Sequence, residues 1–242
     1  MVQFGLVTYK RDYYEEIRLA KSLGFDFFQL WFFNGILCAD TLPEPREKAI
    51  KEAGFPIIIH AVLDLPDFET YQEKFLYLLG YFGHKETIIH PICNKEPVTK
   101  QTVFTLKEKI EKIANEFSRR GIKLYVENNH LIGGFFNTVD DLKIIFEPNP
   151  EIGLLLDLAH INDYDHLREI VQMRYPECIH IADKHFGPGH EHITLGEGEL
   201  DFDMIFSKVI PDYNGRIILE AADSTDGIKK SKETMNRIFG IK

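Results

Sequence analysis

Short apolar runs alternate along this chain with segments whose apolar residues recur at helical spacing. The runs predict eight strands: Val2–Thr8, Phe27–Phe33, Pro56–Val62, Thr87–Pro91, Ile122–Glu127, Gly153–Asp157, Cys178–Ala182 and Arg216–Glu220. The intervening segments predict eight helices: Tyr13–Leu23, Pro45–Ala53, Phe68–Tyr81, a long helix capped by Thr99 and ended by Gly121, one capped by Thr138 and running through Phe146, Asp165–Val171, Phe202–Val209 and Thr225–Phe239. Gly133-Gly134 and Phe186–Glu199 are predicted to be loops. Regular alternation of this kind is typical of a parallel sheet with helical crossovers.

The eight regular units favour a closed barrel over an open, doubly wound sheet. Several strands are apolar at both parities, as expected when both faces are buried. No GxGxxG stretch follows the first strand, and no linker or low-complexity tract divides the 242 residues. We therefore predict an α/β fold with a single (β/α)8 TIM-barrel domain over residues 1–242, and an active site at the C-terminal ends of the strands.

Composition and charge limit the partners and the location that we expect for this protein. The formal charge is −10 and no basic run exceeds a pair, which argues against nucleic acid as a partner. The three cysteines have no CxxC spacing, and no signal-peptide layout or membrane-length apolar segment is present, so we expect a cytoplasmic protein with no membrane partner. Assembly into a homo-oligomer stays open.

Four predicted strands end on residues that can bind a metal. Glu127, Asp157, His180 and Glu220 close the fifth to eighth strands, and in a parallel barrel these ends meet on one face. A single one of them could be a cap or an ion-pair partner. Together, two glutamates, an aspartate and one imidazole form a mainly oxygen site suited to one divalent cation: Mn²⁺, Mg²⁺, Co²⁺ or Zn²⁺.

Further histidines lie near the same face. The candidates for additional metal or substrate contacts are His60, His90, His160, His190 and His192. The last two alternate with Glu191, so an extended chain would put both imidazoles on one side. At the end of the second strand, Trp31 and Phe33 could form an apolar wall for a sugar ring. His84 and His166 are predicted to be surface residues, and His130 and His185 to lie near the site without being ligands.

The ordered motifs HAV, IHP, VEN, LDLAH, IHIADK, HxxLGEG and ILE resemble the xylose-isomerase-like TIM-barrel superfamily. This group includes sugar isomerases, ketose 3-epimerases, inosose-processing enzymes and apurinic (AP) endonucleases of the endonuclease-four type. The resemblance covers the third to eighth strands.

The isomerase and epimerase branch implies one divalent metal on Glu127, Asp157, His180 and Glu220. The two glutamates would also act as acid and base, and His160 would touch the substrate. The GEG step at Gly196–Gly198 is familiar from this branch. The arginine with which ketose 3-epimerases contact the sugar has no counterpart here, because its position falls near Phe186.

The AP endonuclease branch implies up to three zinc ions on nine ligands. Eight of them have counterparts of the same residue type: His60, His90, Glu127, Asp157, His160, His180, His192 and Glu220. The ninth, an aspartate, is His190 here. The chain is also short for that branch, is acidic, and has Asp183-Lys184-His185 in place of an Asp-Ser-Lys stretch.

These observations favour a divalent-metal-dependent isomerase or epimerase of a sugar, sugar phosphate or inosose. It would act by proton transfer next to a carbonyl, with Glu127 and Glu220 as the catalytic pair. The alternative is an endonuclease-four-like AP endonuclease with a multinuclear zinc site. A third reading is a binding barrel that keeps the metal site without turnover.

Overall fold

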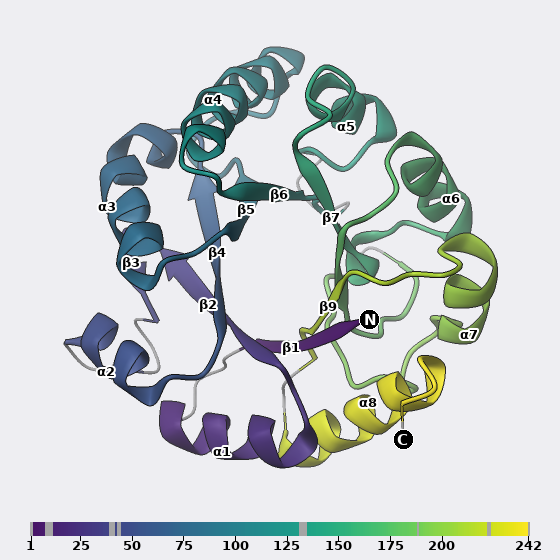
Figure 1. Cartoon of the computed structure of the whole chain (residues 1–242). Coiled ribbons are helices and arrows are strands. Elements are labelled where there is room, and N and C mark those ends of the chain that lie inside the picture. Colours follow the sequence, from purple (N-terminus) through teal and green to yellow (C-terminus); the bar gives the residue numbers. More distant parts are fainter. Residues whose placement is uncertain are drawn as a thin grey trace.

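Eight parallel strands close a barrel in the computed structural model, which describes residues 2–7, 12–38, 42, 45–130, 135–187, 189–221 and 224–241. Figure 1 shows the ring of strands with the helices around it. The barrel strands are β1 (Gln3–Val7), β2 (Phe27–Phe33), β4 (Ile57–Asp64), β5 (Glu86–Ile92), β6 (Lys123–Glu127), β7 (Gly153–Asp157), β8 (Cys178–Ile181) and β9 (Arg216–Leu219). Pairing of β1 with both β2 and β9 closes the ring. The predicted single (β/α)8 barrel is confirmed.

The helices follow the predicted segments within a few residues. They are α1 (Tyr13–Leu23), α2 (Arg46–Ala53), α3 (Asp67–Phe82), α4 (Lys100–Arg119), α5 (Val139–Phe146), α6 (Tyr164–Met173), α7 (Phe202–Met204), which continues as a π-helical turn over Ile205–Val209, and α8 (Thr225–Ile238). Thr99 and Thr138 cap α4 and α5, as predicted, because each side chain accepts a backbone N–H of the first turn.

Two small elements escaped prediction. The two-residue strand β3 (Ile36–Leu37) pairs antiparallel with the end of β2, and a 3-10 turn over Leu158–His160 follows β7. The predicted loop at Gly133-Gly134 lies outside the described residues, as does Thr8, the last residue of the first predicted strand.

Two apolar regions stabilise the barrel. The larger one lies between the strands and the surrounding helices, and a separate cluster fills the barrel interior. The interior cluster consists of Phe27, Ile58, Ile88, Tyr125, Leu155, Cys178 and Ile218. On β1 the matching position is Gly5, where a Cβ atom would clash with the Phe27 ring.

A polar layer lies directly above this floor. Side chains two residues apart on a strand point to the same face. Each floor residue is therefore followed, two positions later, by another inward-pointing residue: Gln29, His60, His90, Glu127, Asp157, His180 and Glu220. The candidate site is thus one layer of the barrel, supported from below by packed apolar side chains.

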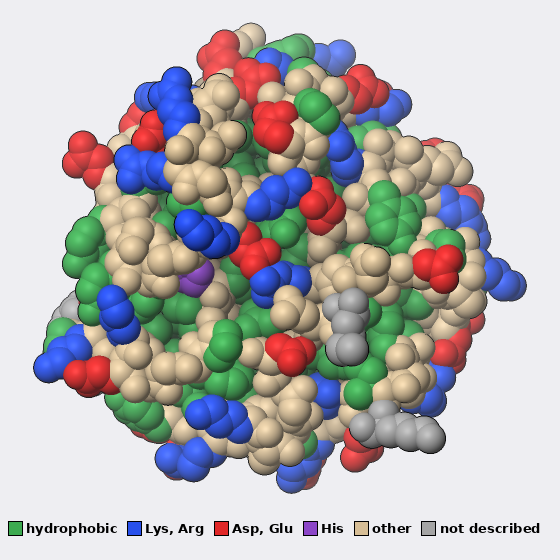
Figure 2. Space-filling model, viewed as in Figure 1, with side chains coloured by type: hydrophobic (Ala, Val, Ile, Leu, Met, Phe, Trp, Pro, Cys, Tyr) green, Lys and Arg blue, Asp and Glu red, His purple; other side chains and the backbone are tan. Residues whose placement is uncertain are grey.

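On the molecular face seen in Figure 2, Lys and Arg side chains are interspersed with Asp and Glu, and no patch of one sign stands out. No helix within the described residues is long and apolar enough to cross a membrane.

Candidate metal centre

The four strand-end residues converge in space. Glu127, Asp157, His180 and Glu220 come from β6, β7, β8 and the position just after β9, and one ligand atom from each lies within 4.8 Å of the others. All four side chains are buried. Four potential ligands from four neighbouring strands therefore share one small volume.

The arrangement fits a cation. Glu220 Oε2 and His180 Nδ1 lie 2.9 Å apart, yet both are buried atoms without a hydrogen-bond partner among the described residues, as is Glu127 Oε2. Buried polar atoms are normally paired, and an unpaired carboxylate oxygen is costly. A divalent ion among these atoms would satisfy them, and the oxygen-rich donor set with one imidazole suits such an ion.

Electrostatics keep this donor set anionic. Burial alone would raise the carboxyl pKa of Glu127, but the imidazoles of His90 and His180 hold it well below its usual range. His160 and His192 lower that of Asp157 in the same way, against the effect of burial. Burial would also lower the pKa of His180, yet Glu220 and Glu127 raise it well above its usual value. A cation entering the site would therefore take the place of protons.

His60 and His90, from β4 and β5, lie on the side of Glu127 that is opposite to Asp157. The His60 Nε2 and His90 Nδ1 atoms lie 2.9 and 3.4 Å from Glu127 Oε2. Both strands continue past these histidines, β4 to Asp64 and β5 to Ile92, which is slightly beyond the predicted ends at Val62 and Pro91. The two imidazoles belong to the polar layer all the same.

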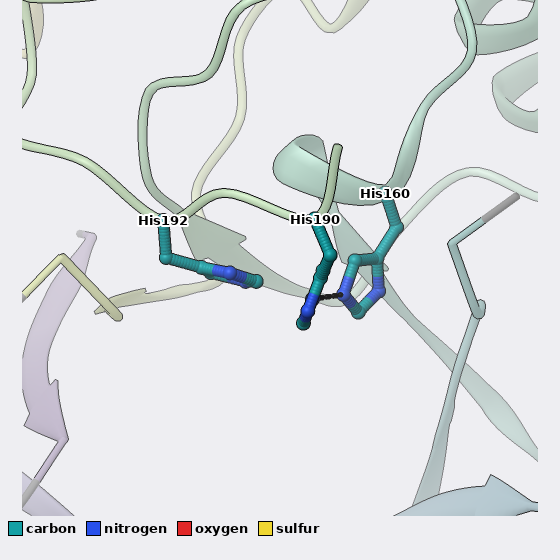
Figure 3. A group of neighbouring side chains, drawn as sticks. All are labelled: His160, His190 and His192. Carbon is teal, nitrogen blue, oxygen red and sulfur yellow. Dashed lines mark hydrogen bonds between the residues drawn. The ribbon is translucent and has the colours of Figure 1, made fainter. Parts of the chain in front are cut away.

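A three-histidine group lies beside the carboxylates. His160 Nε2 and His190 Nε2 are 3.1 Å apart, and Figure 3 shows these two rings with His192 next to them. His192 Nε2 also contacts Asp157 Oδ2 at 3.1 Å. One nitrogen from each histidine lies within 4.8 Å of the others, so this group could hold a second ion.

Hydrogen bonds fix the orientation of the His160 and His90 rings. The Asn128 carbonyl oxygen accepts from His160 Nδ1 at 2.8 Å, which leaves His160 Nε2 with a lone pair. His90 Nε2 lies 2.5 Å from Asn129 Oδ1, and Asn129 donates its own amide to the Pro91 carbonyl. His90 Nε2 therefore carries the hydrogen, and its Nδ1 atom, facing Glu127, has the lone pair.

The long loop after β8 holds His190 and His192 in place. The Asp183 carboxylate accepts the backbone N–H groups of Gly196, Gly198 and Leu200 at 2.8, 3.0 and 3.1 Å. A Cβ atom at Gly198 would clash with Asp183, which explains a glycine in the GEG step by the packing of the loop.

Side chains in this loop alternate as the sequence predicted. His190 faces His160 and His192 faces Asp157, whereas Glu191 points away and accepts from the His185 ring at 2.9 Å. His185 itself is exposed at the surface. The loop therefore directs two of its three imidazoles to the site.

The outer wall of the site is aromatic. The Trp31 ring is half-buried and lies 4.4 Å, centroid to centroid, from the His60 ring. Phe33, at the end of β2, is 48% exposed. His130 stacks on His190 at 4.2 Å, closer to the group than the sequence suggested.

The prediction of a surface position was wrong for His166. Its ring is buried because the chain around Asn137 covers it: His166 Nε2 contacts the Asn137 carbonyl at 2.9 Å, and Nδ1 accepts the Asn162 N–H. Burial lowers its pKa. His84 is half-buried, and burial together with the nearby Arg216 lowers its pKa to about 4.

The sequence also missed supporting residues. Gln29, Asn128, Asn129, Asp183 and Lys184 are buried around the site. Lys184 Nζ donates to the Ile161 carbonyl at 2.9 Å and so links the loops after β7 and β8. The available signal for Gln29 was a single polar residue in the apolar run FFQLWFF, at the parity of the inward-pointing Phe27.

Comparisons with known proteins agree with this architecture. The family model described as a xylose isomerase-like TIM barrel matches residues 17–238. No curated protein matches the sequence.

Solved structures with the same fold include members of both branches. D-allulose 3-epimerase from Methylomonas sp. superposes with a TM-score of 0.75 at 17% identity, covering 98% of each chain. An AP endonuclease of family 2 from Brucella melitensis gives a TM-score of 0.69 at 18% identity over 99% of each chain. The IOLI protein with a bound zinc atom gives a TM-score of 0.68 at 17% identity over 98% of this chain and 97% of that one. At these identities the likeness establishes the fold alone.

Proposed function

Because the chain belongs to the xylose isomerase-like TIM-barrel family, we propose that it is a divalent-metal-dependent isomerase or epimerase of a sugar, sugar phosphate or inosose. The observation that carries this proposal is the convergence of Glu127, Asp157, His180 and Glu220, with one ligand atom of each within 4.8 Å of the rest. Three carboxylates and one imidazole would hold a single hard or borderline divalent ion.

When bound, the ion would polarise a substrate carbonyl and its neighbouring hydroxyl and so acidify the hydrogen on the hydroxyl-bearing carbon next to the carbonyl. Glu127 and Glu220 are the acid–base pair of the proposal. They approach His180 Nδ1 from different strands, at 3.4 and 2.9 Å, so a small substrate could meet a carboxylate on either side. One glutamate would remove the carbon-bound proton and the other, or the same one, would return it.

The surrounding side chains suit a polyhydroxylated substrate. His160 donates from Nδ1, so its Nε2 atom carries a lone pair, and a substrate hydroxyl could donate to this lone pair in place of His190 Nε2, which lies 3.1 Å away. The half-buried Trp31 offers a ring face to the C–H side of a sugar. A second structure of the Methylomonas epimerase contains D-allulose, which supports this substrate class.

Deuterium exchange tests the proposal. The metal-loaded protein would be incubated in deuterated water with ketoses, ketose phosphates and inososes, and followed by NMR. We expect deuterium next to the carbonyl with the wild type and none with Glu127→Gln or Glu220→Gln. Glu116→Gln, the same change at the α4 surface, is the matched control. Absence of exchange across the whole panel would contradict the proposal and favour a binding barrel or the hydrolase.

A phosphodiester hydrolase is the second candidate, and one observation favours it. His160, His190 and His192 form a separate potential metal group beside the carboxylates, and His60 and His90 lie next to Glu127. Several adjacent ions would suit attack on a phosphodiester. The acidic charge of −10 and the histidine at position 190 count against DNA as substrate. Incision of an abasic duplex by the zinc-loaded protein, lost in His60→Ala and His192→Ala, would reverse the ranking.

A further inference from the structure

Gln29 bridges two histidines of the polar layer. It lies on β2, is fully buried, and its Nε2 and Oε1 atoms lie 2.9 Å from His60 Nδ1 and 2.7 Å from His180 Nε2. Both histidines present their other ring nitrogen to Glu127, His60 at 2.9 Å and His180 at 3.4 Å. One amide therefore faces, in each of the two histidines, the ring nitrogen that points away from Glu127.

An amide cannot treat the two rings alike. Its nitrogen only donates hydrogen bonds and its oxygen only accepts them. The ring nitrogen that faces the oxygen must carry a hydrogen, and the one that faces the nitrogen must carry a lone pair. In a neutral imidazole only one nitrogen is protonated, so one histidine carries its hydrogen toward Gln29 and the other carries its hydrogen away from it. Because His60 faces Gln29 through Nδ1 and His180 through Nε2, the two histidines are then the same tautomer.

The carboxylates determine which of the two histidine nitrogens that face Gln29 carries a hydrogen. His180 Nδ1 lies within 3.6 Å of Glu127, Asp157 and Glu220, so it is the nitrogen that must offer a lone pair to a cation held by them. His180 Nε2 then keeps its hydrogen and donates to Gln29 Oε1. The Gln29 amide nitrogen is thereby directed at His60 Nδ1, and the hydrogen of His60 lies on Nε2, facing Glu127.

We propose that Gln29 is a positioning residue that restricts the region around Glu127 to one cation, because it keeps a hydrogen rather than a lone pair on the His60 nitrogen facing Glu127. A second ion beside Glu127 would have only His90 Nδ1 and Glu127 Oε2 as ligands, 3.4 Å apart, which is too few for a stable site. The inference rests on the proposed single-metal isomerase and extends it to the residue that excludes a second ion.

The substitution Gln29→Glu tests the inference directly. An ionised carboxylate accepts from both rings, so His60 and His180 would both place their lone pairs toward Glu127. We expect the Gln29→Glu protein to hold one more zinc ion per chain than the wild type after dialysis, measured by plasma mass spectrometry and by calorimetric titration at pH 8. An unchanged zinc count in a folded Gln29→Glu protein would overturn the inference.

The added negative charge needs a control. The double variant Gln29→Glu/His60→Gln keeps the charge but removes the second imidazole, so we expect its zinc count to return to the wild-type value. Retention of the extra ion would show that charge alone recruits it, and would also overturn the inference.

NMR of the wild type measures the tautomers of His60 and His180 directly and does not depend on the folding of a variant. Long-range ¹⁵N–¹H correlation in the zinc-loaded protein separates protonated from unprotonated ring nitrogens. We expect Nε2–H on both histidines, with zinc-bound Nδ1 for His180 and free, unprotonated Nδ1 for His60. A His60 with Nδ1–H and zinc on Nε2 would contradict the inference.

These measurements are separable from the test of function. A wild type with the expected tautomers but no deuterium exchange would contradict the isomerase alone. Exchange together with zinc on His60 would contradict the role of Gln29 alone.

Discussion

His192 Nε2 donates to Asp157 Oδ2 across 3.1 Å and thereby ties the loop after β8 to the carboxylate at the end of β7. Burial alone would lower the pKa of His192, but the Asp157 and Glu220 carboxylates raise it to about 9. The same aspartate is needed for the cation. Protonated His192 and a metal ion therefore compete for Asp157.

This competition predicts a pH-dependent metal affinity. Below the raised pKa of about 9, His192 carries a proton whose positive charge opposes a cation, so affinity should increase as pH rises from 7 to 9. His192→Gln can still donate to Asp157 but cannot titrate, so the dependence should become weaker by up to about tenfold per pH unit for the lost proton. Competition titrations with a chromophoric zinc chelator would measure it. An identical dependence in both proteins would exclude His192 as the competing group.

Removing one carboxylate should reduce metal affinity and activity together. Glu127→Gln and Glu220→Gln nearly keep the shape of the side chain but remove one negative charge from the cluster. We expect affinity to fall by more than the roughly 10–100-fold that follows loss of a hydrogen-bond partner of a metal ligand. The melting temperature of the metal-free protein should change little, because the apolar floor under the site is intact. Full turnover by chelator-treated wild type would contradict the metal requirement itself.

Acid should destabilise the fold partly through His84, at the N-terminal side of β5. Its folded pKa is lowered to about 4 from 6.5, by burial first and then by Arg216. The unfolded chain therefore takes up a proton as pH falls below 6.5, while the folded one does not do so until about pH 4. Stability is lost across that window and unaffected by His84 above it. Urea unfolding at several pH values should show a smaller loss in His84→Leu, and an equal loss would contradict this assignment.

The turn at Gly198 should be sensitive to a single methyl group. In Gly198→Ala the Cβ atom would clash with Asp183 and the Lys184 carbonyl, so we expect a cost of about 1–3 kcal/mol and displacement of the loop that carries His190 and His192. Gly189→Ala is the matched control, since its nearest contact would be an ordinary 3.7 Å. Urea unfolding and zinc titration of both variants would check this. Equal behaviour of the two would show that Asp183 does not organise the loop.

Residues at strand ends were predictable because barrel topology alone brings them to one face. Glu127, Asp157 and Glu220 needed only a correct strand assignment to be expected together. Gln29 was not predictable in this way, since it lies in the middle of an apolar run and its role depends on rings from β4 and β8. The prediction of a surface position for His166 was wrong because residues at the start of a helix are usually exposed, whereas the chain around Asn137 covers this one. Contacts made by irregular segments leave no periodic signal.

Each residue of the floor, which consists of Phe27, Ile58, Ile88, Tyr125, Leu155, Cys178 and Ile218, lies two positions before a residue of the polar layer on the same strand. Core packing is therefore complete one layer below the polar side chains of the candidate site. We therefore expect that a substitution in the polar layer changes the chemistry of the candidate site without changing the packed floor that stabilises the fold. For protein engineering, the polar layer can therefore be varied while the residues of the floor are kept unchanged.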